Sequence, residues 1–289
     1  MVDSIASIDG TTEDTPIVHI SDIHGYLSEA RSALLAVGEI DPFPPIVTVD
    51  ENRSLHWADN DYILVVNGDL IDRGPANESC LKLVYRLIEE APAGRVRYNI
   101  GNHEMAILLP GIFDWPDTYS TNLSTEARQT FLRRILDGDI TAAFEGHNYL
   151  YTHAGSNDPI DPQEVNEELR EATTDLLKAS ESQINSEVPT QEHVQERYER
   201  LFALGDDGGR GPSAGLCWMD FTHLEKSAPP QIVGHTMRQR AVRKGNVVCG
   251  NVLRMNERSK GGEGVLFEVP DYLTFVYRLP GGTALTKDL

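Results

Sequence analysis

The 289-residue sequence is short of basic side chains, and of lysine in particular. It has 45 acidic residues against 25 basic ones, only six of them lysine, and a formal net charge of -20. A surface of this sign repels the phosphate backbone of nucleic acids and the anionic lipids of membranes, so neither is expected as a partner. At molar salt the Debye length shrinks to about 3 Å and the self-repulsion largely disappears. A salt-adapted protein is therefore one interpretation, and an ordinary acidic enzyme is the other.

Cysteine and long apolar runs are scarce as well. The three cysteines, Cys80, Cys217 and Cys249, are far apart and form no C-x-x-C pair. This argues against a disulfide framework and favours small buried side chains. Apolar runs such as Ile63 to Val66 are far too short to cross a bilayer. The N-terminal stretch is polar and acidic, unlike a secretion signal, so a cytoplasmic location is the default expectation.

What the chain does contain is five short strand-like segments, each followed directly by a turn that carries Asp, Asn or His. The clearest is Asp61 to Asn67, an apolar run that leads into the turn Gly68-Asp69-Leu70-Ile71-Asp72-Arg73-Gly74. The other four units span residues 16–25, 95–104, 149–155 and 231–236. Strands of an α/β fold place reactive groups at their carboxyl ends. The sequence therefore predicts a metal and phosphate site where the five turns meet.

Apolar residues at helical spacing connect the first three of these units. They predict helices at Ser28 to Val37, Asn77 to Ile88 and Asn102 to Leu109. Residues 41–57 include three prolines and are expected to form a surface loop or an irregular ribbon. A further helix is expected within residues 111–138, on the outside of the core.

The second half of the chain is predicted to begin with an acidic helical insertion, at about residues 158–215 of a single domain. Asp161-Pro-Gln-Glu164 resembles a capping box, and a second helix is expected from Gln191 to Leu204. The insertion either covers the mouth of the site or packs on its flank. Gly205 to Gly215 lacks the spacing of a phosphate-binding loop, so no nucleotide cradle is predicted. Later segments are expected to be antiparallel strands of a second sheet, at residues 247–249, 264–269 and 272–279.

Three of the turns carry motifs that together resemble a known family. These are Ser21-Asp22-Ile23-His24-Gly25, Gly68-Asp69-x-x-Asp72-Arg73-Gly74 and Gly101-Asn102-His103-Glu104. They resemble the signatures of the calcineurin-like metallophosphoesterase superfamily and, within it, of the phosphoprotein phosphatases, with Ser21 in place of a glycine. His153-Ala154-Gly155 and Gly234-His235 fit the later histidine motifs of that family.

The resemblance implies an α/β fold in which two mixed sheets form a four-layer β-sandwich with flanking helices, and a dinuclear metal site at the strand ends. The metal ligands it implies are Asp22 and His24 for the first ion, Asn102, His153 and His235 for the second, and Asp69 for both. Carboxylate and amide oxygens mixed with imidazoles also suit manganese, iron or zinc better than calcium. Two divalent ions are thus the expected cofactor, manganese first, with iron or zinc as alternatives.

The reaction implied is hydrolysis of a phosphate monoester by a hydroxide that bridges the two ions. Arg73 has a planar guanidinium suited to two phosphate oxygens. His103 is the candidate general acid for the leaving oxygen, with Asp72 orienting its ring. Asn102 and His103 are also expected to contact the phosphate, and Arg210 is the one upstream candidate for a second phosphate-binding arginine.

The departures from the family pattern concern the substrate rather than the reaction. Ile100 replaces the arginine that usually precedes Gly-Asn-His-Glu, Met237 replaces a second histidine, and Trp218-Met219-Asp220 replaces a tryptophan closely followed by arginine. Glu104 has no predicted role beyond a helix cap. The leading prediction is a serine/threonine phosphatase that acts on a phosphorylated protein or a small phosphoester. The alternatives are a dinucleoside polyphosphate hydrolase, for example of diadenosine tetraphosphate, and a metal-binding scaffold without turnover.

The charge balance predicts that salt stabilises the protein. Raising KCl from low to molar concentration should increase the urea concentration at the midpoint of unfolding, because screened carboxylates repel one another less. Circular dichroism would follow the transition, and phosphate release would follow activity over the same series. Greatest stability and activity in dilute buffer would contradict salt adaptation.

Overall fold

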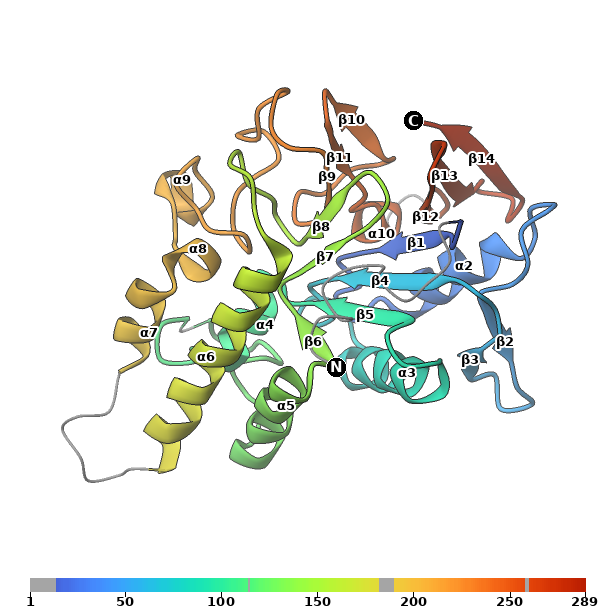
Figure 1. The fold of residues 1–289 in the computed structure, drawn as a ribbon. Coiled ribbons are helices and arrows are strands. Elements are labelled where there is room, and N and C mark those ends of the chain that lie inside the picture. The colour runs from blue at the N-terminus through green and yellow to red at the C-terminus, as the bar shows by residue number, and fades with distance from the viewer. Residues whose placement is uncertain (1–13, 114, 182–189, 258–259) are drawn as a thin grey trace.

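Two mixed β-sheets lie face to face at the centre of the molecule, with helices outside them (Figure 1). This computed structural model describes residues 14–113, 115–181, 190–257 and 260–289. The first sheet consists, in spatial order, of β14 (Ala284–Asp288), β13 (Tyr272–Arg278), β12 (Gly264–Val269), β1 (Ile17–Ile20), β4 (Ile63–Asn67), β5 (Val96–Asn99) and β6 (Ile140–Thr141). The second consists of β10 (Val242–Lys244), β11 (Val247–Cys249), β9 (Gln231–Val233), β8 (Leu150–Thr152) and β7 (Ala143–Glu145). The predicted α/β sandwich is confirmed.

The side chains of the central strands β1 and β4 point alternately into two apolar layers, one on each face of the first sheet. Successive side chains of a strand point to opposite faces of the sheet. Ile17, Ile63 and Val65 accordingly pack between the sheets, against side chains of the second sheet that include Phe144 and Ile232. The residues between them in sequence join the larger core beneath the helices. Each fully buried aliphatic side chain contributes about 1.5–3 kcal/mol, so the continuous apolar run after residue 61 stabilises both interfaces at once.

Helices cover the outer faces of the sandwich (Figure 1). Those that contact the first sheet are α2 (Leu27–Val37), α3 (Asn77–Glu90) and α5 (Thr125–Asp137), and α4 (Asn102–Leu108) contacts α5. Helix α5 is capped at its N-terminus by Ser124, whose hydroxyl accepts from the Ala127 N–H at 3.2 Å, and at its C-terminus by Gly138 with φ 86°. Both are common helix boundaries. Within the described residues, no helix is both long enough and apolar enough to pass through a bilayer.

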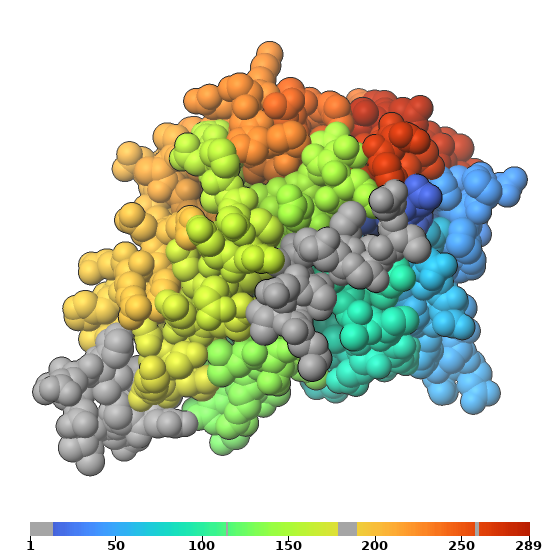
Figure 2. Space-filling view, viewed as in Figure 1, coloured from blue at the N-terminus to red at the C-terminus, as the bar shows by residue number. Residues whose placement is uncertain are grey.

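The predicted helical insertion packs mainly on the flank. Helix α6 (Pro162–Glu181) contacts α5 and β7, and α7 (Gln191–Arg197) and α8 (Glu199–Phe202) contact α6. These helices and the β2–β3 ribbon, formed by Val47–Val49 and Leu55–Trp57, occupy opposite ends of the molecule (Figure 2). The second predicted helix is interrupted at Tyr198, whose φ and ψ of -112° and 47° are not helical. Residues 182–189 of the insertion and the polar N-terminal residues 1–13 lie outside the described part of the chain.

Of the two alternatives for residues 41–57, the structure shows the ribbon and not the loop, because β2 and β3 pair there and bury Ile46, Leu55 and Trp57. The prediction that the late strands form the second sheet is wrong in part. Of the late strands, only β11 lies in the second sheet, where it pairs parallel with β9 and antiparallel with β10. Strands β12, β13 and β14 extend the first sheet instead, because β12 pairs antiparallel with β1. The alternation of apolar and polar residues is the same for strands of either sheet, so it cannot show which strand each one pairs with.

Buried amides connect the two sheets directly behind the strand ends. The Asn67 amide donates to the Thr152 carbonyl at 2.7 Å, and the Asn99 amide donates to the Asn67 side chain and to the Tyr151 carbonyl, both at 3.0 Å. The Thr141 hydroxyl donates to Asn99 Oδ1 at 2.8 Å. Asn67 and Asn99 are fully buried, so each polar atom depends on these partners.

Removing one of these amides should destabilise the fold. We expect Asn99→Ala to lower the free energy of unfolding by about 2–4 kcal/mol, because it leaves buried carbonyl and hydroxyl groups without partners. Urea denaturation would measure the loss. The exposed Asn52 offers a matched control, and Asn52→Ala should change stability by less than about 0.5 kcal/mol. Equal effects of the two substitutions would refute the role of the amide network.

Candidate metal centre

The turns that follow β1, β4, β5, β8 and β9 meet at one edge of the sandwich. Several of their residues have a positive φ that is uncommon for side chains with a Cβ: 52° at Asp22, 49° at His24, 54° at Asp69, 70° at Asp72 and 59° at His235. Such conformations cost of order 1–3 kcal/mol each and persist where the surrounding structure determines them. Their concentration in three of the five converging turns marks this edge as the functional one.

Two motif glycines allow the turns to approach so closely. A Cβ at Gly68 would lie 2.4 Å from His153 Nδ1, and a Cβ at Gly101 would lie 2.3 Å from Asp69 Oδ1. Neither space could hold a methyl group without moving a candidate ligand. Glycine is therefore required at both positions by the packing of the site.

Asp69 lies between two histidines. Its Oδ2 atom is 3.4 Å from His24 Nε2 and 3.4 Å from His153 Nε2. The other nitrogen of each ring is directed at a backbone carbonyl, with His24 Nδ1 2.7 Å from Ile71 O and His153 Nδ1 2.8 Å from Asn67 O. Those carbonyls can only accept, so each Nδ1 carries a proton, and Nε2 is the atom that each ring can offer to a metal. Histidines that bind metals are oriented in this way.

Asn102, His235 and Asp22 complete the group. Asn102 Oδ1 lies 3.2 Å from His153 Nε2 and 2.9 Å from His235 Nδ1. The His235 backbone N–H donates to Asp22 Oδ2 at 3.0 Å, whereas Asp22 Oδ1 is buried and has no hydrogen-bond partner among the described residues. The structure thus brings together all six residues predicted as metal ligands.

The electrostatics of the group suit a bound cation. Burial raises the pKa of Asp22 to about 7 and lowers the pKa of His24 to about 3. Burial also lowers the pKa of His153, but the attraction of Asp69 and Asp22 outweighs it and raises that pKa to about 10. Neutral imidazole and charged carboxylate are the forms that bind metals, so a cation here would displace a proton from His153. A buried carboxylate without a cation is costly.

Two overlapping sets of donors have the spacing of metal ligands. In each set all ligand atoms lie within 4.8 Å of one another, and the sets are His24, Asp69, His103 and Asp69, His153, His235. Asp69 belongs to both sets, as expected for a ligand shared by two ions. Mixed oxygen and imidazole donors fit manganese, iron or zinc.

The predicted acid pair lies beside these donors. His103 Nδ1 is 2.8 Å from Asp72 Oδ2, and the exposed Arg73 reaches His103 Nε2 with Nη2 at 3.2 Å. Ser120, which no motif indicated, donates to Asp72 through its backbone N–H at 2.8 Å and its hydroxyl at 2.5 Å. Asp72 therefore has a fixed orientation from which it can hold the Nδ1 proton of His103.

Arg210 also reaches the site. It follows the single turn α9 (Asp206–Gly209), and its Nε donates to His235 Nε2 at 3.0 Å while Nη2 lies 3.2 Å from Asp220 Oδ2. Since Nε2 accepts from Arg210, the His235 proton is on Nδ1, where it can donate to Asn102. Metal binding through Nδ1 would require this proton to move to Nε2, and Arg210 would then keep its pairing with Asp220 and its contact with the His235 carbonyl.

Glu104 is the functional residue whose importance the sequence did not reveal. It closes the predicted helix cap by accepting from the Gly101 N–H at 2.9 Å. It also accepts from the N–H groups of Asp69 and Leu70, both at 2.8 Å. Burial and the nearby Asp69 raise its pKa. One buried carboxylate thus joins two motif turns. The sequence indicated only its contact with Gly101, because that contact belongs to the capping box.

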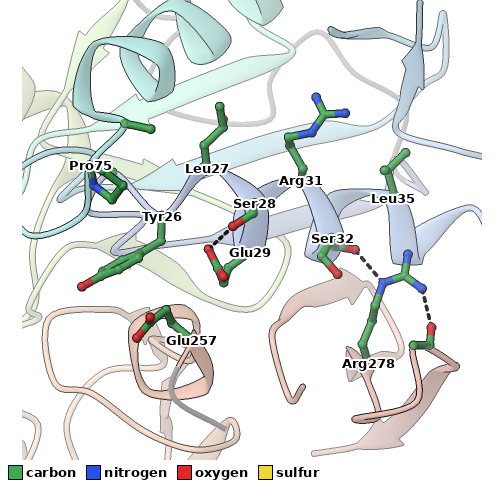
Figure 3. Close-up of a pocket in the computed structure, with 13 residues that line it drawn as sticks. Tyr26, Leu27, Ser28, Glu29, Arg31, Ser32, Leu35, Pro75, Glu257 and Arg278 are labelled. Carbon is green, nitrogen blue, oxygen red and sulfur yellow. Dashed lines mark hydrogen bonds between the residues drawn. The ribbon is translucent and has the colours of Figure 1, made fainter. Parts of the chain in front are cut away.

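A groove of about 810 Å³ adjoins the site on one side (Figure 3). It lies between α2 and the short helix α10 (Leu253–Glu257). It begins at Gly25, the last residue of the first motif, and at Pro75, which directly follows the second. Two of its charged side chains have partners: Arg278 pairs with Glu39 through two contacts of 2.6 Å, and Glu29 accepts from the Ser28 hydroxyl at 2.6 Å. None of its lining residues is a candidate metal ligand. The groove therefore provides space next to the metal centre and adds no ligand to it.

Comparison with known proteins agrees with this geometry. A family model described as calcineurin-like phosphoesterase matches residues 15–236. An uncharacterized protein of Schizosaccharomyces pombe is 28% identical over 125 residues, which cover 43% of this chain and 34% of that protein. The match thus spans about a third of the length of that relative.

Two solved structures share the fold. One is the cold-active protein-tyrosine phosphatase of a psychrophilic Shewanella species, with 20% identity, a TM-score of 0.57, and coverage of 98% of this chain and 84% of that one. The other is a protein serine/threonine phosphatase from Saccharomyces cerevisiae, with 13% identity, a TM-score of 0.50, and coverage of 99% and 83%. At these identities the likeness concerns the fold alone.

Glu104 should control metal affinity without being a ligand. In Glu104→Gln an amide NH₂ would face backbone N–H groups, so we expect metal affinity to fall roughly 10–100-fold and the free energy of unfolding to fall by about 1–3 kcal/mol. Metal titration followed by elemental analysis would measure the first effect. Glu78→Gln, on the exposed face of α3, is the matched control. Unchanged metal affinity in Glu104→Gln would contradict its positioning role.

Proposed function

Because the chain belongs to the calcineurin-like phosphoesterase family, we propose that it hydrolyses phosphate monoesters with two divalent metal ions, and that its substrates are phosphoserine and phosphothreonine in proteins. One observation carries this proposal. Asp69 lies within ligand distance of His24 and also of His153 and His235, and the pair His103 and Asp72 lies beside these donors together with the exposed Arg73. The site can thus hold metal ions as the electrophile, and it places His103 as an acid and Arg73 as a phosphate ligand next to them.

In the proposed site, Asp22 and His24 hold one ion, Asn102, His153 and His235 hold the other, and Asp69 holds both. Manganese is the first candidate, with iron or zinc as alternatives. When bound, such a pair of ions lowers the pKa of a coordinated water and neutralises charge on the phosphoryl oxygens. The backbone carbonyls of Ile71 and Asn67 keep the Nε2 atoms of His24 and His153 free for ligation.

The remaining side chains bind the phosphate and move a proton. Arg73 turns from His103 Nε2 to two phosphate oxygens, for which its guanidinium is suited. This frees Nε2 to carry a proton, which it gives to the leaving oxygen. Asp72, fixed by Ser120, keeps the Nδ1 proton in place and stabilises the charged ring before the transfer. Arg210 is the proposed second phosphate ligand, since it already lies at His235.

A substrate panel tests the proposal. Phosphoserine and phosphothreonine peptides, a small phosphate monoester and diadenosine tetraphosphate would each be incubated with the protein and Mn²⁺. Released phosphate would be measured for the monoesters, and released ADP, ATP or AMP for the dinucleotide. We expect the phosphopeptides to be hydrolysed. Cleavage of the dinucleotide alone would favour the dinucleoside polyphosphate hydrolase, and full metal binding without any turnover would favour the scaffold.

The acid is tested by His103→Asn. We expect kcat to fall by roughly 10²–10⁴, because the leaving oxygen loses its proton donor, while elemental analysis finds the wild-type metal content. His193 is exposed on α7, so His193→Asn is a control that should keep wild-type kcat. Full activity in His103→Asn would remove this histidine from the mechanism.

A further inference from the structure

One long stretch of this acidic chain contains no acidic residue. Residues 226–256 hold six of the 25 basic residues and none of the 45 acidic ones, and they include the candidate metal ligand His235. The six are Lys226, Arg238, Arg240, Arg243, Lys244 and Arg254. Among the residues that the structure describes, no carboxylate lies within 4.0 Å of any of their charged nitrogens. The carboxylates of the protein thus leave these cations without an ion-pair partner.

Two of these cations share one aromatic ring. Arg238 Cζ and Lys244 Nζ each lie 5.0 Å from the centroid of the Phe221 ring, which is buried. Lys244 Nζ also donates to the carbonyls of Phe221 and Thr222, at 2.7 and 3.1 Å. Burial and the like charge of Arg238 lower the pKa of Lys244. Both basic side chains are half-buried, so each still presents part of its charge to solvent. We call Arg238 and Lys244 the Phe221 cation pair.

The Phe221 cation pair lies next to the candidate metal centre. Arg238 follows His235 by three residues, so their Cα atoms are at most about 11 Å apart. Arg210, which donates to His235, also pairs with Asp220, the residue directly before Phe221. One residue of an extended peptide spans about 3.3–3.6 Å. A side chain one to three positions from a phosphorylated residue can therefore reach the pair while the phosphate lies at the metal centre.

Two carboxylates of the neighbouring loop have partners of their own. Asp220 Oδ2 lies 3.2 Å from Arg210 Nη2, and Asp220 Oδ1 accepts from the N–H and the hydroxyl of Thr222, both at 2.9 Å. Glu225 accepts from the Ser227 hydroxyl at 3.3 Å. The Phe221 cation pair is therefore left to attract a carboxylate from another molecule.

We propose that the Phe221 cation pair is a specificity subsite that binds a carboxylate of the substrate, and that the enzyme prefers phosphorylated residues with aspartate or glutamate one to three positions away. This inference rests on the proposed function and names the class of protein segment on which it acts. The phosphoryl group binds at the metal centre and Arg73, and the pair binds a second anion of the same peptide. The negative surface elsewhere repels an acidic segment, so the pair also fixes the direction in which the segment lies.

Peptides that differ only in charge test this preference. Two aspartates directly before or directly after a phosphoserine would be compared with asparagines at the same positions, with Mn²⁺ and at low salt. We expect kcat/KM to be roughly two- to tenfold higher for at least one aspartate peptide than for its asparagine counterpart. The gain should appear in KM, because the contact is the same in the bound substrate and in the transition state. Molar KCl should remove it, since the Debye length falls to about 3 Å. Equal kcat/KM for all four peptides would overturn the subsite.

Substitutions on the two faces of β10 separate the subsite from net charge. Lys244→Gln should lower the aspartate preference and Arg238→Gln with Lys244→Gln should abolish it, whereas Lys244→Glu should favour peptides with lysines at these positions. Arg243 is the matched control, because it precedes Lys244 on the strand and points to the opposite face, where it lies 5.7 Å from the Tyr149 ring. Arg243→Gln removes the same charge and should keep the preference. An equal loss in Lys244→Gln and Arg243→Gln would contradict the proposal.

Binding provides a readout that does not depend on turnover. Fluorescence anisotropy would compare labelled aspartate and asparagine peptides in which a phosphonate replaces the phosphate ester. We expect tighter binding of the aspartate peptide by the wild type and loss of the difference when both cations are replaced by glutamine. If the wild type hydrolysed no peptide but showed this pattern of binding, the proposed function would fail while the subsite remained. If it hydrolysed and bound all peptides equally, only the subsite would fail.

Discussion

The carboxylate of Glu104 is the interaction on which the candidate centre depends most. It accepts three backbone N–H groups, from Gly101, Asp69 and Leu70, and so joins the turn after β4 to the start of α4. Asp69 and Asn102, one candidate ligand from each turn, are placed by this single group. Hydrogen bonds from backbone N–H groups to a carboxylate are stronger than those to a neutral acceptor. Because Glu104 is completely buried, water does not compete for them. The separation of the two proposed ion sites is therefore set by the backbone rather than by flexible side chains.

The rest of the sandwich maintains this junction. The buried amides of Asn67 and Asn99 fix the second sheet to the ends of β4 and β5, so the turn with His153 has a constant position relative to Asp69. The positive φ angles of Asp22, Asp69 and His235 cost conformational energy. The apolar layers on both faces of β1 and β4 stabilise the sandwich by far more, which allows strained turns to persist where the chemistry needs them.

The sequence predicted the parts of the site that depend on residue type and spacing, and missed those that depend on tertiary contacts. Each of the five turns follows a short apolar run, and parallel strand ends lie at one edge, so the meeting of Asp22, Asp69 and Asn102 could be expected from order alone. The pairing of β12 with β1 could not, since alternation is identical in either sheet. Ser120 comes from a segment without a motif, and only folding brings it to Asp72. Arg210 was a candidate by position along the chain, and its contact with His235 gives it a place in the site.

The strongly acidic surface repels a phosphate ester, which is also negatively charged. At an ionic strength of about 0.1 M, charges on the surface are screened over roughly 10 Å, so the net charge of -20 acts weakly on a phosphate already at the strand ends. There the nearest groups are the exposed Arg73, Arg210 and the donors for two cations. These groups attract the phosphoryl group only at short range, while the negative surface as a whole repels a substrate that approaches it. Binding selectivity must then come from short-range contacts, which is the range over which the two arginines would act in the proposed site.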